Sequence, residues 1–209
     1  MKKEVVILFI LLITSSYNFG QSSIRYFVKG GLNLSNTNFK VIEKGVSSSR
    51  EFDNRKSFYV AAGINFPLTE EKDNILLQVQ LAYSEQGWVY NYTEPGDFTT
   101  HEINQINLPI YLKARVHHNF YFNIGTYLGY VVHSKEKSSH NPNRFEVDDY
   151  KNFDSGLLAG LEYHFNFGLF LETKYMFGLS DISKVAYPSS FIEHSYKNRV
   201  LQIGLGYTF

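Results

Sequence analysis

Apolar and polar residues alternate along most of this chain, and that period of two restricts its fold more than any other feature. The last segment shows it most clearly, with an apolar set that alternates with a polar or small set: Leu201, Ile203, Leu205, Tyr207 and Phe209 against Gln202, Gly204, Gly206 and Thr208. A period of two places the two sets on opposite faces of a β-strand. Strands of this kind are expected throughout the body of the chain.

Eight alternating segments follow one another, so the sequence predicts an all-β fold. They lie near residues 24–35, 57–67, 75–90, 103–115, 120–132, 154–165, 169–180 and 201–209. Pro109 weakens the fourth segment, because proline has no N–H to donate to a β-ladder.

The connections between these segments alternate in length. Short turns are expected at 68–74, 116–119 and 166–168, and long polar loops at 36–56, 91–101, 133–153 and 181–197. Short turns at one end and long loops at the other are typical of transmembrane β-barrels. We therefore predict an eight-stranded antiparallel up-and-down transmembrane β-barrel. Both termini and the short turns are expected to face the periplasm, with the long loops outside.

One short turn can be predicted in detail. Phe165 and Leu169 share a face of the predicted strands only if an odd number of residues connects them. A three-residue loop over 166–168 meets this condition and places Gly168 where the turn needs a left-handed residue.

The first residues have the pattern of a secretory signal. Met1-Lys2-Lys3 is basic, the run from Val5 to Ile13 is apolar, and small and polar residues follow. This run is too short for a transmembrane helix, which needs about 20 residues. We expect a cleaved signal peptide over residues 1–20, with residues 21–209 forming the exported barrel domain. The alternative is an ordinary N-terminal strand or core helix.

Composition excludes several classes of function. Acidic and basic side chains are equal in number, at 20 each, which argues against a nucleic-acid partner. The absence of cysteine excludes disulfides, thiolate zinc sites and a cysteine nucleophile. No cofactor is expected.

Charged residues in the middle of strands decide which face meets lipid. Exposing Arg or Lys to hydrocarbon costs about 2–4 kcal/mol at the membrane midplane, so in a membrane these side chains must face the lumen. The sequence thus predicts a polar network in the lumen: Arg25, Lys29, Lys113, Arg115, Glu162, Glu172 and Lys174. Inward glycines are expected to make room for these long side chains. A soluble periplasmic lipocalin-like carrier, with the apolar face inward, is the alternative.

Two carboxylates of this network are expected to face each other. Glu162 lies opposite Glu172 if the turn between their strands has three residues. We expect Lys174, together with Lys113 or Arg115, to neutralise the pair. In the alternative, the register slips and the two carboxylates never meet.

Several segments resemble the PorT-like outer-membrane β-barrel family of Bacteroidetes-type bacteria. The likeness extends over about residues 24–209 and rests on loose patterns at 28–35 (VKGGLNLS), 106–113 (INLPIYLK), 156–162 (GLLAGLE) and 201–209 (LQIGLGYTF). It implies an eight-stranded barrel in the outer membrane, in which a Leu-Pro step in strand four is common. It also places Phe209 at the aromatic signal read by the barrel-insertion machinery. The member that names the family is tied to protein secretion, which makes a secretion-system protein one candidate partner.

Candidate chemistry is confined to the predicted loops. His133, His140 and His194 lie there with Asp148, Asp149 and Glu193, and with Ser138, Ser139, Ser189 and Ser190. No nucleophile elbow or phosphate-binding loop accompanies them. We expect a monomeric outer-membrane protein without enzymatic activity, with a structural, adhesive or secretion-associated role and loops that bind an extracellular partner. A hydrolase active at the barrel rim is the other alternative.

Overall fold

The protein is described here from a computed structural model, over residues 24–43, 46–50, 52–69, 74–94, 96–140, 143–184 and 192–209. Ten strands form one antiparallel sheet: β1 (Arg25–Glu43), β2 (Val46–Arg50), β3 (Asp53–Pro67), β4 (Ile75–Asn91), β5 (Phe98–His117), β6 (Phe120–Ser138), β7 (Phe145–Glu146), β8 (Phe153–His164), β9 (Leu169–Gly178) and β10 (Ile192–Thr208). The signal peptide predicted over residues 1–20 lies outside the described residues.

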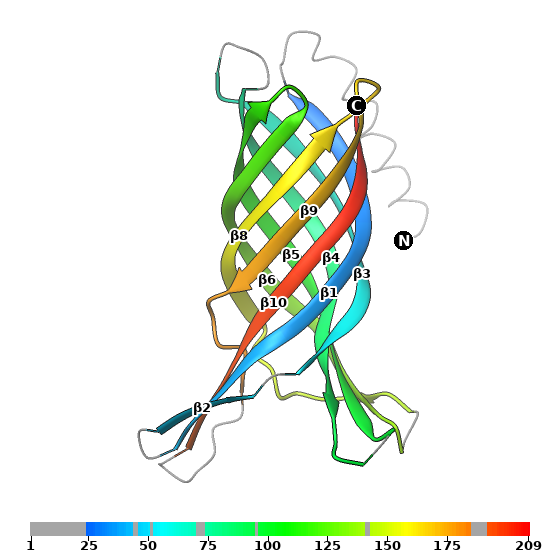
Figure 1. The fold of residues 1–209 in the computed structure, drawn as a ribbon, viewed down its shortest axis with the longest axis vertical. Helices are drawn as coiled ribbons and strands as arrows, with labels where there is room; N and C mark the ends of the chain where they lie inside the picture. The colour runs from blue at the N-terminus through cyan, green and yellow to red at the C-terminus, as the bar shows by residue number, and fades with distance from the viewer. Residues whose placement is uncertain are drawn as a thin grey trace, which may run out of the picture.

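The sheet closes into a barrel because its last strand pairs with its first (Figure 1). The β1–β10 ladder runs from Phe27 opposite Thr208 to Glu43 opposite Ile192. Eight strands form the wall, and each matches one predicted segment. The two short strands are additions, since β2 pairs with β1 and β7 pairs with β6. The predicted up-and-down antiparallel barrel is therefore confirmed.

At one end four wall strands, β1, β5, β6 and β10, continue well beyond the predicted boundaries. The β4–β5 ladder reaches Asn91 opposite Phe98, and β6 extends to Ser138. Below the barrel in Figure 1, one projecting sheet contains β2 with the ends of β1 and β10, and a second contains the ends of β4, β5 and β6. We call this end the extended end and the other the short-turn end.

The predicted long loops are thus wrong over much of their length. The alternation fades in segments 36–43 and 133–138 because polar side chains occupy both faces of the strands. The backbone groups nevertheless remain paired with neighbouring strands, so the ladders continue where the sequence pattern ends.

The turn between β8 and β9 is the predicted three-residue loop. The Phe165 N–H donates to the Leu169 carbonyl at 2.8 Å, and Gly168 has a φ of 94°. This left-handed conformation costs glycine little, because it has no Cβ. The loop also fixes the register that follows, in which Glu162 lies directly opposite Glu172. The slipped register is therefore wrong.

Pro109 lies within β5, on the inner face of the wall. Its neighbours in the β4–β5 ladder pair Val79 with Ile110 and Ala82 with Asn107, and the proline lies in the gap between these pairs. The missing N–H therefore interrupts the β4–β5 ladder locally, but β5 continues through the proline.

The two faces of the wall differ sharply. On β9, Leu171 and Tyr175 are 44% and 45% exposed, whereas Glu172 and Lys174 are 3% and 1% exposed. Exposed aromatic side chains lie toward both ends of the outer apolar band: Tyr26, Phe58, Phe120, Tyr130, Phe153, Phe167, Tyr175, Phe177 and Tyr207. The barrel is apolar outside and polar inside, opposite to the lipocalin-like alternative.

Candidate functional site

Two carboxylates on neighbouring strands organise the charged part of the barrel interior. On β9, Glu172 accepts hydrogen bonds from the Lys29 ammonium at 2.6 Å and the Lys174 ammonium at 3.2 Å. The Tyr59 hydroxyl donates to the same carboxylate at 3.2 Å. All four side chains come from the inner faces of β1, β3 and β9, where the strand period of two places them.

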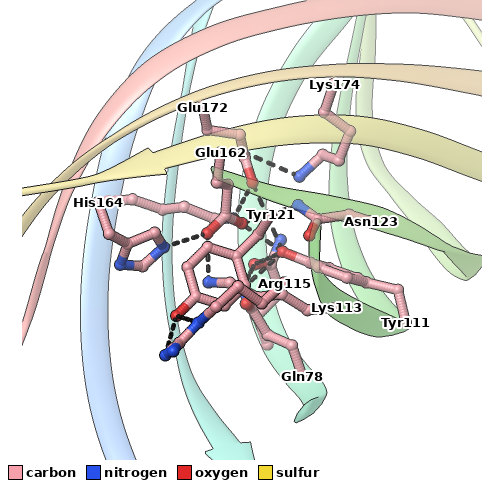
Figure 2. A network of polar contacts seen from close by, with 12 residues as sticks. Gln78, Tyr111, Lys113, Arg115, Tyr121, Asn123, Glu162, His164, Glu172 and Lys174 are labelled. Atoms are coloured by element: carbon pink, nitrogen blue, oxygen red, sulfur yellow. Dashed lines mark hydrogen bonds and ion pairs between the residues drawn. The ribbon is translucent and has the colours of Figure 1, made fainter. Parts of the chain in front are cut away.

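The second carboxylate, Glu162, forms its own set of contacts on β8. Lys113 forms an ion pair with it, Asn123 donates from Nδ2 at 2.9 Å, and His164 Nε2 lies 2.8 Å away. Figure 2 shows how both carboxylates and their cations converge around Tyr111. Buried ions are stable in a barrel only when such pairs compensate the lost hydration.

The seven predicted network residues divide into three groups. Lys29, Lys113, Glu162, Glu172 and Lys174 come together and are each at most 5% exposed. Arg115 is exposed instead, and its Nε and Nη2 donate to the Tyr121 hydroxyl at 3.1 and 2.9 Å. Arg25 is half-buried and lines a cavity of about 340 Å³ at the short-turn end that Lys113 and His164 also touch.

Nearer the extended end lies a buried carboxylate that the sequence reasoning missed. Asp154 is fully buried and accepts hydrogen bonds from Asn198 Nδ2 and Ser180 Oγ, both at 2.8 Å. Gln105 Nε2 and the Tyr127 hydroxyl lie at 3.3 Å. The sequence does indicate that Asp154 faces inward, because it lies an even number of residues from Glu162 on the same strand.

An aromatic cluster closes the lumen at the extended end. Trp88 is 1% exposed and stacks between His101, with ring centroids 5.0 Å apart, and Tyr196, at 5.4 Å. We call this group the plug: Trp88, His101, Ile103, Val131, Tyr150, Ile182 and Tyr196. Its members come from β4, β5, β6 and β10, from the segment before β8 and from the segment after β9. Several of them lie in or beside predicted loops, and the sequence pattern gave no sign that they meet.

His101 is the titratable ring of the plug. Burial lowers its pKa from the ordinary value of 6.5, while Glu136 and Asp149 act in the opposite direction. The Tyr150 hydroxyl lies 3.0 Å from His101 Nδ1, and burial raises the pKa of that tyrosine. Both rings therefore favour the neutral state in the plug.

The remaining candidate chemistry sits on the projecting sheets. Ser139 donates from Oγ to Asp97 at 2.6 Å, and the His140 Nδ1 atom lies 3.1 Å from the same carboxylate oxygen. In a catalytic triad, the two ring nitrogens contact the serine and the carboxylate separately. Here the Ser139 hydroxyl and the Asp97 carboxylate both lie beside Nδ1 of His140, so the histidine cannot relay a proton between them.

His133 is exposed on β6, and the side chains of Glu193 and His194 lie outside what the structure describes. Over the described residues, no group of three or more His, Asp or Glu side chains is placed to hold a metal ion.

No helix of the described residues is long and apolar enough to cross a lipid bilayer.

The sequence profile of a family described as the outer membrane protein beta-barrel domain matches residues 19–184. No curated protein matches the sequence.

Several solved structures are similar in fold at low sequence identity. OprG from Pseudomonas aeruginosa is 12% identical, with a TM-score of 0.49, over 91% of this chain and 98% of that one. Neisserial surface protein A is 12% identical, with a TM-score of 0.46, over 90% and 98% of the two chains. Ail of Yersinia pestis is 13% identical, with a TM-score of 0.39, over 87% and 98%.

The family profile covers most of the chain, and the barrel has the apolar exterior and ion-paired interior that a lipid environment requires. The protein is an outer-membrane β-barrel in contact with lipid, and its chain belongs to the outer membrane protein β-barrel domain family.

Proposed function

We propose that this protein is a non-enzymatic, non-conducting anchor that holds two projecting β-sheets outside the cell for binding a partner. One observation carries the proposal: the wall strands continue past a closed lumen as paired sheets. Sheets of this length are not needed to connect neighbouring strands, and surface segments positioned by a rigid scaffold commonly carry binding functions.

The closed lumen argues against transport. The Glu172 and Glu162 ion pairs, the Asp154 hydrogen bonds and the Trp88 plug fill the interior at successive levels. An eight-stranded barrel is just wide enough for its own side chains to fill it. Ions that enter from either end therefore meet packed side chains.

The proposed orientation follows the usual arrangement of outer-membrane barrels, with short turns in the periplasm and the extended end outside. It includes export by the signal peptide at residues 1–20 and a monomeric barrel. It also includes Phe209 as an insertion signal for the barrel-insertion machinery. Phe209 is 71% exposed at the short-turn end, where the centroid of its ring lies 5.2 Å from that of the Tyr207 ring.

Within the broader family, we assign the chain to the PorT-like group. The four segments that carry this resemblance lie in β1, β5, β8 and β10, so they belong to the barrel wall. This assignment keeps a secretion-associated role open beside an adhesive one.

The projecting sheets provide the test. Residues 134–147 and 40–50 are each replaced by a short Asn-Gly turn, in separate variants of the full chain. Heat-modifiable migration in gels reports whether the barrel still folds. Cells that produce each variant are then compared for adherence to protein-coated and glycan-coated surfaces and for the amount of secreted protein.

We expect folded barrels with reduced adherence, or with reduced secretion if the role is secretion-associated. Unchanged adherence and secretion in both variants would contradict partner binding by the sheets. Stable conductance of the full chain in planar bilayers would contradict the non-conducting anchor.

A further inference from the structure

The outer surface of β10, β1 and β3 carries a polar groove at the edge of the apolar band nearest the extended end. The groove has a volume of about 460 Å³, and its lining includes Arg199, Asn36, Asn38, Asn54, Ser49 and Tyr175. In the barrel orientation proposed above, this edge lies at the headgroups of the outer leaflet.

Arg199 is held in place while part of its guanidinium stays available. Its Cζ lies 3.5 Å from the Phe177 ring centroid, and Nη1 donates to the carbonyls of Gly178 and Asn198, both at 2.8 Å. Its Nε and Nη2 atoms make no hydrogen bond to any described residue. Two adjacent N–H groups of a fixed guanidinium match the oxygens of a phosphate group.

Two lysines extend the positive charge around this groove. Lys56 is exposed next to Leu34, and Lys197 lies opposite Asn38. Neither lysine forms an ion pair with a carboxylate of the described residues. We call Arg199, Lys56 and Lys197 the basic patch. Three cations without a paired acid among the described residues favour an anionic ligand.

An apolar hollow of about 800 Å³ lies on the same strands, deeper in the membrane. Two small outward residues, Gly30 and Ala62, form its floor, and Val60, Leu81, Leu205 and Tyr207 line its sides. A hollow on a surface that faces hydrocarbon fits an acyl chain.

The spacing of the two features matches one lipid molecule. On β3, six residues separate Lys56 from Ala62, which is about 20 Å along a strand. A strand tilt of about 40° reduces this to about 15 Å along the membrane normal, half of a hydrocarbon core about 30 Å thick. A lipid with its headgroup at the basic patch therefore places its chain at the hollow.

We propose that this face binds a phosphorylated lipid of the outer leaflet, with the phosphate at Arg199 and an acyl chain in the Gly30–Ala62 hollow. A second copy of the chain is disfavoured as the occupant, because a two-fold interface through this face brings two basic patches together. The proposal rests on the orientation given in the proposed function.

The test uses the purified full chain in detergent micelles, with native mass spectrometry to measure bound lipid. The probes are bis-phosphorylated lipid A, the same glycolipid without phosphates, and phosphatidylcholine. The variants are Arg199→Gln, Lys56→Gln and Ala62→Leu. The matched control is Lys135→Gln, which removes a cation from β6 on the other projecting sheet. Heat-modifiable migration checks that each variant is folded.

We expect lipid A to bind at least tenfold more tightly than the glycolipid without phosphates and than phosphatidylcholine, whose single phosphate is neutralised by its choline group. Arg199→Gln should weaken its binding about tenfold, Lys56→Gln less, and Lys135→Gln not at all. Ala62→Leu should weaken binding of lipid A, because the larger side chain fills the hollow that holds the acyl chain. Equal binding of the phosphate-free glycolipid, or equal loss in Arg199→Gln and Lys135→Gln, would overturn the proposal. So would dimers that cross-link in the wild type and are lost in Ala62→Leu.

A separate measurement tests the orientation. A short epitope inserted between Pro95 and Gly96 should be labelled by antibody on intact cells. Its inaccessibility would reject the proposed orientation and so the outer-leaflet lipid, while lipid A binding in micelles would still report on the basic patch itself.

Discussion

At the scale of residues, the interior is held by side chains that share partners. Changing one of them leaves a buried charge or polar group of its partner without compensation. Glu172 is shared by Lys29, Lys174 and Tyr59, so its charge balances more than one group. Aromatic rings fill the remaining space by lying against glycines of neighbouring strands. The predicted use of these glycines was to make room for charged side chains, but Gly204 and Gly206 face Tyr59 and Phe170 instead.

Replacing Glu172 with Gln should strongly destabilise the barrel. The amide keeps the shape but leaves Lys29 and Lys174 buried without a counter-charge, and breaking a buried pair costs about 3–5 kcal/mol. Urea unfolding in lipid vesicles, followed by heat-modifiable migration, measures the change. Thr173→Val, on the lipid-facing side of the same strand, is the control and should change stability by less than about 0.5 kcal/mol. An unchanged midpoint in Glu172→Gln would contradict the role of the ion pairs.

Gly206→Ala should destabilise the barrel by about 1–3 kcal/mol through overpacking. A Cβ built at Gly206 lies 2.2 Å from Cζ of Phe170, a ring that is 1% exposed. Phe170→Leu replaces that ring with a smaller side chain. The double variant should therefore be more stable than the sum of the two single changes predicts. The same urea titration measures all three variants. Strict additivity would show that the two positions are not in contact.

At the scale of elements, the sequence predicts what depends on alternation and misses what does not. The eight wall strands, the Gly168 turn and the pairing of Glu162 with Glu172 all follow from the period of two. The projecting sheets and the plug do not follow from this period. Their residues are polar or aromatic on both faces, and residues far apart in sequence come into contact only because the barrel closes. The five buried charged residues of the network were predictable from phase alone. Their individual partners were not, since these lie across the lumen.

The plug gives a pH-dependent signal. The pKa of His101 is lowered by folding, so the unfolded chain binds its proton more readily. The contribution of neutral His101 is therefore complete above pH 6.5 and is lost as the pH falls through the lower pKa of the folded state. Trp88, the only tryptophan, stacks on this ring. Its fluorescence should be constant from pH 8 to 6.5 and change below that.

His101→Gln should remove most of this pH dependence, because glutamine does not titrate. Tyr92→Phe, outside the plug, is the control and should keep it. A transition of equal size in His101→Gln would show that His101 does not carry the signal.

At the scale of the whole molecule, the arrangement of side chains is the reverse of that in a soluble protein. Apolar side chains face the hydrocarbon of the membrane, and charged side chains are paired in the lumen. Ile124 is 54% exposed on the part of β6 between the exposed aromatic residues Phe120 and Tyr130, and Val116 is 62% exposed at the short-turn end. Both are apolar and outward, yet they differ in depth. The cost of a charge should therefore depend on position along the strand.

Ile124→Arg should cost about 2–4 kcal/mol, whereas Val116→Arg should cost about 0–1 kcal/mol, because the second guanidinium reaches the interface. Folding yield into vesicles and urea midpoints measure both. Equal costs at the two sites would contradict the depth assigned to the apolar band.

The packed interior has a further consequence for the cell that carries this protein. A barrel that does not conduct, as proposed above, adds no leak to the membrane, however many copies are present. Under that proposal, many copies can be inserted without making the outer membrane more permeable. Abundance on the surface is then limited by membrane area and not by permeability.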